Sequence, residues 1–479
     1  METAEDWMRY LVWKADEGMP RIRQLRGYTD GNAPLPEMGQ NLKRSWAKFQ
    51  RKAVANSGGL VVNALCERVK PSGVIVGDDP DGPATAAARL LWRDNRLDAV
   101  LADAIRDCFT YGAGYLLTSV DEDGAAVITR ESPEWMYVEP DPIRPWRARA
   151  AVKAWRDMPA QTDHLHMWAP GVYASWTRPC YDSQQRIVQT ISGGWAPETE
   201  TQFDGPVPVA VLENAGRRGE FEDQTGLIDR INLGILYRLV TMAMQTYRQR
   251  ALKVDEGGEG LPQVDADGNQ IDYQDIFEPG PGALWELPPG VSLWESQTTD
   301  VNPFLAAVKD DWRELAAETS TPLSAMLPDA ANQSASGAEQ PMRGLVSKAE
   351  DRIGRIQPAI AACLASALRT SNTDPGGTVQ VLFEHPAYVS ISEKYAAAAQ
   401  ARGAGLSLET VEELVLGMSP VQIAQDRRRR LSEQMEAAAQ AAPAAPAPVP
   451  APAAQAPAPV PQGAPALAGR PGEAAADVG

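Results

Sequence analysis

Residues 226–252 read GLIDRINLGILYRLVTMAMQTYRQRAL, an uninterrupted helical pattern. A helix of about 25 residues spans roughly 37 Å. Its apolar residues return at the spacing of one helix face: Ile228, Ile231, Ile235, Leu239 and Met242, widened by Leu227, Leu236 and Val240. The stretch therefore predicts a long helix that buries one side.

A second helix is predicted at 301–318, where Asn302 can cap the helix and Pro303 fits its first turn. Residues 253–300, between the two helices, are rich in Gly, Pro and Asp, with strand-like pieces at 282–287 and 291–295. The sequence therefore predicts two helices that flank a small β-containing insert.

Residues 1–225 mix helical and strand-like patterns. Helical spacing covers the first 30 residues, residues 39–69 with a break near 56–59, and residues 83–111. Strands are predicted at 114–120 and 125–130, with a hairpin turn between them, and residues 131–211 keep this character. We expect 1–225 to form one α+β region.

Downstream of the second helix, residues 319–340 are small and polar, which is typical of a functional or disordered loop. A long helix follows at 341–370, with a kink expected at Gly354 and Pro358. The remaining predicted elements are a strand at 379–383 and helices at 407–416 and 419–437. Residues 438–479 are Ala/Pro low complexity and predict a disordered tail.

The charge balance excludes one class of function. The 479 residues contain 45 Lys and Arg against 63 Asp and Glu, a formal net charge of −18. A protein that grips nucleic acid by neutralising phosphates needs a basic face, which this composition does not favour. A protein that lets nucleic acid slide past a repelling wall remains compatible with it. The run Arg427–Arg430 is open to two interpretations, a solvated helix face or a phosphate contact.

The sequence gives little support to metal binding, disulfides or membrane insertion. The four cysteines are widely spaced and form no C-x-x-C pair. The acidic start of the chain is no secretory signal, and no stretch reaches the roughly 18 apolar residues that span a bilayer. The Asp265–Asn269 segment departs from a calcium loop in its Gly position and favours a tight turn.

Candidate catalytic residues are few, because the chain has three histidines and no phosphate-binding or nucleophile motif. His164 and His166 lie two apart on one face of a predicted strand, with Asp163 facing the other way. No further ligand completes a metal set with them. We therefore predict no catalytic residue, no metal and no cofactor, and keep an unrecognised soluble enzyme as the alternative.

The order of elements and several separate motifs resemble the portal proteins of tailed bacteriophages, especially the type common in phages of actinobacteria. The resemblance covers about residues 5–435. The stretches that carry it are Tyr111–Tyr115 (YGAGY), Glu131–Pro133 (ESP), Gly226–Asn232 (GLIDRIN), Phe277–Ala283 (FEPGPGA), Trp294–Ser296 (WES), Thr319–Leu323 (TSTPL) and Ser334–Gly337 (SASG).

This resemblance implies a homo-oligomeric ring, usually of twelve subunits, at one capsid vertex. It implies a role as the conduit for double-stranded DNA in packaging and ejection, without sequence specificity. The implied partners are terminase, the head–tail adaptor, and the major capsid and scaffolding proteins. The implied location is the virion, after assembly in the host cytoplasm, with no membrane partner. A capsid-associated scaffold without a channel is a further alternative.

The resemblance also assigns parts of the chain. Residues 1–225 would be the wing, 226–252 and 301–318 the stem helices, 253–300 the clip, and 319–340 the tunnel loop. Residues 341–378 would form a kinked wing helix, and 379–437 a helical region near the crown. The DNA-facing residues of the loop would be Ser324, Asn332, Gln333, Ser334 and Ser336, and the docking surface of the clip would be Asp275, Phe277, Trp285 and Trp294.

Overall fold

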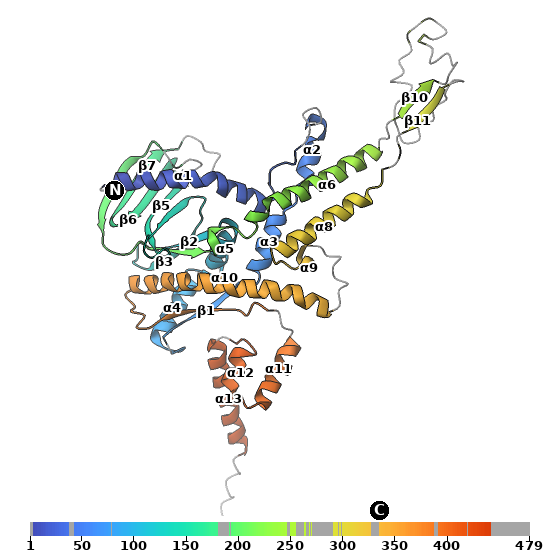
Figure 1. Ribbon diagram of the computed structural model, residues 1–479. Helices are drawn as coiled ribbons and strands as arrows, with labels where there is room; N and C mark the ends of the chain where they lie inside the picture. The colour runs from blue at the N-terminus through green and yellow to red at the C-terminus, as the bar shows by residue number, and fades with distance from the viewer. Residues whose placement is uncertain are drawn as a thin grey trace, which may run out of the picture. The chain divides into compact units, whose positions relative to one another are not determined.

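The computed structural model describes residues 3–37, 43–77, 79–180, 191, 193–246, 250–254, 263–264, 268, 270, 291–295, 297, 299–326, 335–387, 391–418 and 420–441. The chain divides into two compact units, Met1–Ala424 and Gln425–Gly479. The mixed helical and strand architecture confirms the predicted α+β class (Figure 1).

The N-terminal part of the chain is helical, as predicted. Its helices are α1 (Ala4–Thr29), α2 (Lys43–Ala53), α3 (Ser57–Cys66), α4 (Pro83–Asp94) and α5 (Leu97–Tyr111). Thr3 and Asp6 form a reciprocal capping box that starts α1. The break between α2 and α3 lies at 54–56, slightly before the predicted 56–59, and the Asn56 side chain accepts from the Gly59 amide and caps α3.

In the YGAGY stretch, 111–115, helix α5 ends and strand β2 begins. Gly112 has φ of +90°, and a Cβ there would lie 2.2 Å from the Arg217 carbonyl oxygen. A Cβ at Gly114 would lie equally close, 2.2 Å, to the carbonyl oxygen of Ala104. Both positions require glycine because another main-chain segment occupies the space of a side chain.

Two antiparallel sheets follow. The small sheet has the order β3-β2-β9, built from β2 (Ala113–Val120), β3 (Ala126–Glu131) and β9 (Val209–Glu213). The large sheet is a five-stranded meander of β4 (Met136–Pro140), β5 (Ala148–Asp157), β6 (Thr162–Ala169), β7 (Gly171–Pro179) and β8 (Ala196–Phe203). The strands predicted at 114–120 and 125–130 are β2 and β3.

The sheets and helices stack in layers. Helix α1 covers one face of the large sheet, where Leu11 and Met19 pack with Leu165 and Met167 (Figure 1). The other face of the large sheet packs on the small sheet through residues such as Tyr115 and Trp168. The far face of the small sheet packs against α5 and the long helix α10 (Ala335–Thr370). Alternation along each strand therefore fills a separate core on either side.

Two short connections lead into the next helix. They are the 3-10 turns η1 (Ala215–Arg217) and η2 (Glu222–Gln224). Helix α6 (Thr225–Thr246) begins at the predicted place but ends earlier than the predicted residue 252. Its apolar stripe stops at Met242, and the main chain of β10 (Arg250–Val254) pairs instead with β11 (Val291–Glu295). Strand pairing therefore replaces the last helical turns.

The second half of the chain departs from prediction at two loops. Helix α8 (Asn302–Glu318) is confirmed, but the predicted loop 319–340 contains the short helix α9 (Leu323–Met326). The long helix begins at Ala335, six residues before the predicted start, because Ala, Glu and Gln in this stretch are good helix formers. It continues through Gly354 and Pro358 as one helix.

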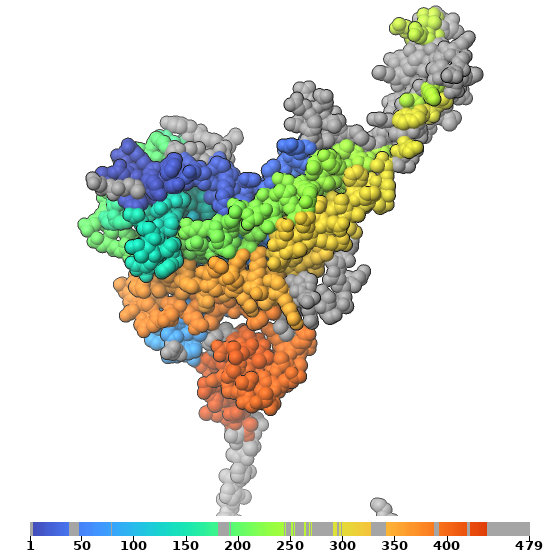
Figure 2. All heavy atoms as spheres, in the orientation of Figure 1, coloured from blue at the N-terminus to red at the C-terminus, as the bar shows by residue number. Residues whose placement is uncertain are grey.

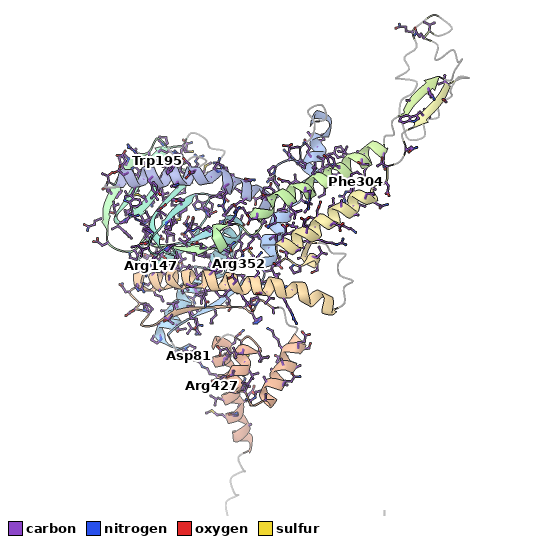
Figure 3. All side chains as sticks on the ribbon, in the orientation of Figure 1. Asp81, Arg147, Trp195, Phe304, Arg352 and Arg427 are labelled. Atoms are coloured by element: carbon purple, nitrogen blue, oxygen red, sulfur yellow. The ribbon has the colours of Figure 1, made fainter. Side chains whose placement is uncertain are left out.

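The last elements are β12 (Val379–Phe383), α11 (Ile391–Gly403), α12 (Leu408–Leu414) and α13 (Pro420–Ala441). Strand β12 pairs with β1 (Pro71–Val76), which joins segments about 300 residues apart in sequence. Helix α11 was not predicted. The second unit is described as far as Ala441, and the rest of the predicted tail lies outside the described residues. Arg427, Arg428 and Arg429 are exposed on α13, and Arg430 forms an ion pair with Asp426 (Figure 3 labels Arg427).

Candidate functional site

Helices α6 and α8 form an antiparallel pair, with their atoms in contact along the two helices (Figures 1 and 2). The roots of the pair, at the start of α6 and the end of α8, each bury one face, through Ile228 and Ile231 on α6 and Trp312 and Leu315 on α8. A Cβ at Gly234 would lie 2.7 Å from a methyl carbon of Val308, so glycine permits close approach of the two helices there. Arg230 of α6 reaches Asp311 of α8 at 2.9 Å and also contacts Glu314.

The outer half of the pair has a different surface. Beyond Leu236, no described side chain of α6 is buried, and Tyr237 and Met242 are 48% and 51% exposed. On α8, residues 302–307 are likewise not buried, and Phe304 is half-buried (Figure 3). Large apolar side chains of the helix pair are therefore left about half exposed in the single subunit.

The β10–β11 hairpin lies within the predicted clip. Trp294 pairs across the hairpin with Ala251 and is 53% exposed. Asp275, Phe277 and Trp285, the other predicted docking residues, lie outside the described residues, as does most of the Asp265–Asn269 turn. Trp294 alone is therefore placed by the structure, on an exposed strand.

The predicted tunnel-loop residues are only partly placed. Ser324 is exposed on α9, two residues before the buried Met326. Ser336 is in the first turn of α10, and Asn332, Gln333 and Ser334 lie outside the described residues. The structure therefore does not bring these five residues together into one described surface.

A buried ion cluster, which the sequence did not predict, lies at the roots of the helix pair. Glu220, just before α6, receives Lys348 Nζ and Arg352 Nε of α10, each at 2.6 Å. Lys348 Nζ also donates to the carbonyl oxygen of Thr319, at the end of α8, at 2.9 Å. Burial by itself raises the pKa of Glu220, but the Arg352 hydrogen bond and the Lys348 charge outweigh it and hold the pKa below its ordinary value. The only signal in the sequence was the spacing of Lys348 and Arg352, one helical turn apart.

The predicted histidine pair is on β6, at the face of the large sheet opposite Asp163. His164 stacks on Trp155, with ring centroids 5.2 Å apart, and His166 Nδ1 lies 2.9 Å from the Tyr173 hydroxyl. Asp163 is buried and accepts from Arg156 at 2.6 Å and Arg178 at 3.1 Å. Over the described ranges, no three His, Cys, Asp or Glu side chains gather as a metal site.

The cysteines and the helices give no sign of redox chemistry or membrane insertion in the part of the chain that the structure describes. Cys66, Cys108, Cys180 and Cys363 are not joined in disulfides. Burial raises the pKa of Cys66 to about 12 and that of Cys363 to about 11, which makes both thiols poor nucleophiles. Among the described helices, none is both long enough and apolar enough to cross a bilayer.

Comparison with known proteins identifies the family. The family model described as "Phage portal protein, SPP1 Gp6-like" matches residues 69–440, well over half of the chain. No curated protein matches the sequence.

Among the solved structures that are similar to this chain are three particle structures, and each of these comparisons covers 83% of it. The "Neck of native GTA particle computed with C12 symmetry" has 15% identity, a TM-score of 0.46 and 99% of its chain covered. The "Virion of native gene transfer agent (GTA) particle" has 14% identity, a TM-score of 0.44 and 99% coverage. The "Neck of empty GTA particle computed with C6 symmetry" has 13% identity, a TM-score of 0.44 and 100% coverage. The sequence match to the family model, which extends from β1 almost to the end of α13, shows that the chain belongs to the phage portal protein family.

Proposed function

We propose that twelve copies of this chain form a ring at one vertex of a capsid and that double-stranded DNA passes through its central channel. The α6–α8 pair is the stem of each subunit, strands β10 and β11 belong to the clip, and residues 319–340 form the tunnel loop. The role is structural rather than enzymatic, so a separate ATPase supplies the energy of packaging.

The observation that carries this proposal is the uncovered apolar surface on the outer half of the stem. Tyr237 and Met242 expose about half of their side-chain surface to solvent in the single subunit. Tyr237 and Met242 lie five residues apart, so they face different sides of α6, as the two neighbours of a subunit in a ring would require. A second copy of the same chain is the occupant that a closed ring supplies, because each subunit then presents one side of its stem to the next.

The charge of the chain supports passage of DNA rather than tight binding. A ring of twelve chains at −18 each carries a formal charge of −216. Acidic walls repel phosphates, so DNA moves past them without being held. On this proposal, Ser324, Asn332, Gln333, Ser334 and Ser336 supply neutral hydroxyl and amide groups that contact phosphates only weakly.

The clip is the proposed docking site for terminase during packaging and for the head–tail adaptor afterwards. Trp294 supports this assignment, because an exposed tryptophan on a hairpin is a typical anchor of a protein interface. Asp275, Phe277 and Trp285 complete the proposed surface. The major capsid and scaffolding proteins are the expected partners of the wing.

Mass photometry and negative-stain images of the purified protein test the proposal. The expected result is a ring about twelve subunits in mass, with a central hole. A protein that stays monomeric under all conditions, including with capsid partners, would count against the ring. A closed assembly without a hole would favour a scaffold role instead.

The enzyme alternative rests on His164 and His166. Changing both to alanine would abolish function if they were catalytic, whereas the portal proposal expects packaging to continue. The aromatic surroundings of both rings favour a packing role, since His164 stacks on Trp155 and His166 contacts Tyr173.

A further inference from the structure

One side chain of α10 contacts the roots of both stem helices. Lys348 Nζ lies 2.6 Å from Glu220, which precedes α6, and donates to the Thr319 carbonyl oxygen at the end of α8 at 2.9 Å. The Thr319 hydroxyl in turn donates to the Leu315 carbonyl oxygen at 2.7 Å, which closes the last turn of α8. A single ammonium group therefore joins α10 to the segment that leads into α6 and to the C-terminal cap of α8.

Arg352 adds a second contact from the next turn of α10 (Figure 3). Its Nε atom lies 2.6 Å from Glu220, and its guanidinium also contacts Asp351. The Glu220 side chain is only 3% exposed, and those of Lys348 and Arg352 are 14% and 15% exposed. We call Glu220, Lys348, Arg352 and the Thr319 carbonyl oxygen the root latch.

The root latch lies at a point along α10 that separates two parts of this helix. The N-terminal arm of α10, residues 335–344, precedes Leu345, which is buried in the main core, and the start of the arm belongs to the proposed tunnel loop, 319–340. The C-terminal part packs in the main core, where Ile356 and Ile360 are fully buried. The root latch lies between the arm and this anchored part.

We propose that the root latch couples the N-terminal arm of α10 to the roots of α6 and α8, so that movement of the arm is passed to the stem. A buried charge cannot be left without its partner at low cost. For that reason α10 cannot slip past the stem roots one contact at a time, and arm and roots move together. The coupling is a property of one subunit. It can therefore be absent although the ring forms, and it can be present although the ring does not form.

Hydrogen exchange in a two-by-two set of variants of the full chain tests the coupling. Gly344→Ala stiffens the arm, since alanine favours helix over glycine, and exchange in the arm should slow about two- to fivefold. Through the root latch, hydrogen exchange at the main-chain amides of Glu220, Glu222 and Gln224 should slow as well. These amides are protected by hydrogen bonds to the carbonyl oxygens of Phe109, Gly219 and Phe221, in that order. Exchange at Thr319–Thr321 would not report on the root latch alone, because the methyl group added at position 344 would itself contact Ser320 Cβ, at 3.9 Å.

In a Lys348→Met background, Gly344→Ala should slow exchange in the arm only. Lys348→Arg, which keeps the charge, should restore the response at 220–224, and Glu220→Gln should abolish it if Lys348→Met does not fold. Lys153→Met is the matched control, because it removes another buried lysine–glutamate pair, with Glu131 at 2.6 Å, on the large sheet. It should lower stability and leave the response intact. An equal response at 220–224 with and without Lys348, or no response in the unmodified chain, would overturn the coupling.

Discussion

The Nδ1 atom of His166 lies 2.9 Å from the hydroxyl oxygen of Tyr173 on the neighbouring strand. Burial, helped by the nearby Lys153 charge, lowers the pKa of His166 to about 4. A histidine in the unfolded chain has a pKa of about 6.5. Between about pH 6.5 and 4, the unfolded state therefore binds a proton at His166 that the folded state does not. The folded state therefore loses stability from this group as the pH falls from about 6.5 toward 4.

Replacing His166 by glutamine should remove that pH dependence. Urea unfolding at pH 7 and pH 4.5 should show that the unmodified protein loses about 2–3 kcal/mol more than His166→Gln over this interval. The same loss in both proteins would mean that His166 is not the group responsible.

Two glycines should respond in opposite ways to alanine. A Cβ at Gly18, inside α1, meets nothing within 4 Å, so Gly18→Ala should raise the free energy of unfolding by about 0.5–1 kcal/mol. A Cβ at Gly219 would lie 2.3 Å from the Thr110 carbonyl oxygen, so Gly219→Ala should lower it by about 1–3 kcal/mol. Thermal unfolding of both variants checks the pair, and the same sign for both would contradict the packing described here.

Substitution of Asp163 should be among the most destabilising changes in the large sheet. Asp163→Asn leaves Arg156 and Arg178 without their buried carboxylate, and we expect a loss of about 3–5 kcal/mol in chemical denaturation. Glu5→Gln, which breaks the exposed pair with Arg9, serves as the comparison and should change little. A loss for Asp163→Asn no larger than for Glu5→Gln would refute a stabilising role for the buried pair.

Charged residues on the outer half of α6 should leave the fold of the single subunit unchanged but prevent ring assembly. Tyr237→Asp combined with Met242→Asp places two carboxylates where we propose that a neighbouring copy packs. Analytical ultracentrifugation should then find subunits of unchanged fold that no longer assemble. The variant Ile143→Asp, at a side chain 84% exposed between β4 and β5, should assemble normally. Intact rings from the stem double variant would place the subunit contact elsewhere.

The boundaries of α9 and α10 determine which loop deletion is informative. Deleting 324–338 removes Met326, which is buried, and the first turn of α10, so it should destabilise the subunit itself. Deleting 327–334 spares both elements, and we expect normal melting and ring formation but poor DNA packaging or retention. Equal melting temperatures for the two deletions would show that Met326 contributes little to the core.

Periodicity predicted the elements that bury one face locally. Helices α5, α6 and α8 and the β2–β3 hairpin follow from spacing within a single segment. Helix α11 was missed because its run of alanines, 396–399, gives no apolar stripe to distinguish from a loop. The end of α6 was placed too late because the strand that pairs with Arg250–Val254 lies about 40 residues further along the chain.

Contacts between segments that are far apart in sequence could not be predicted from local residue patterns. Glu220 and Lys348 are far apart in sequence, and nothing near Glu220 indicates that it faces two cations. Similarly, Asp163 was expected on the face opposite the histidines, which is confirmed, but its two arginine partners come from neighbouring strands. Charged clusters of this kind become visible only once the strands and helices are packed.

Helix α1 bears on how the protein can be shortened. The family match begins at residue 69, yet the apolar side of the five-stranded sheet is covered by side chains from Ala4 to Met19. A fragment trimmed to the matched range would expose Leu165, Met167 and Trp176 to water and invite precipitation. Any soluble minimal version of this subunit must therefore keep its first thirty residues.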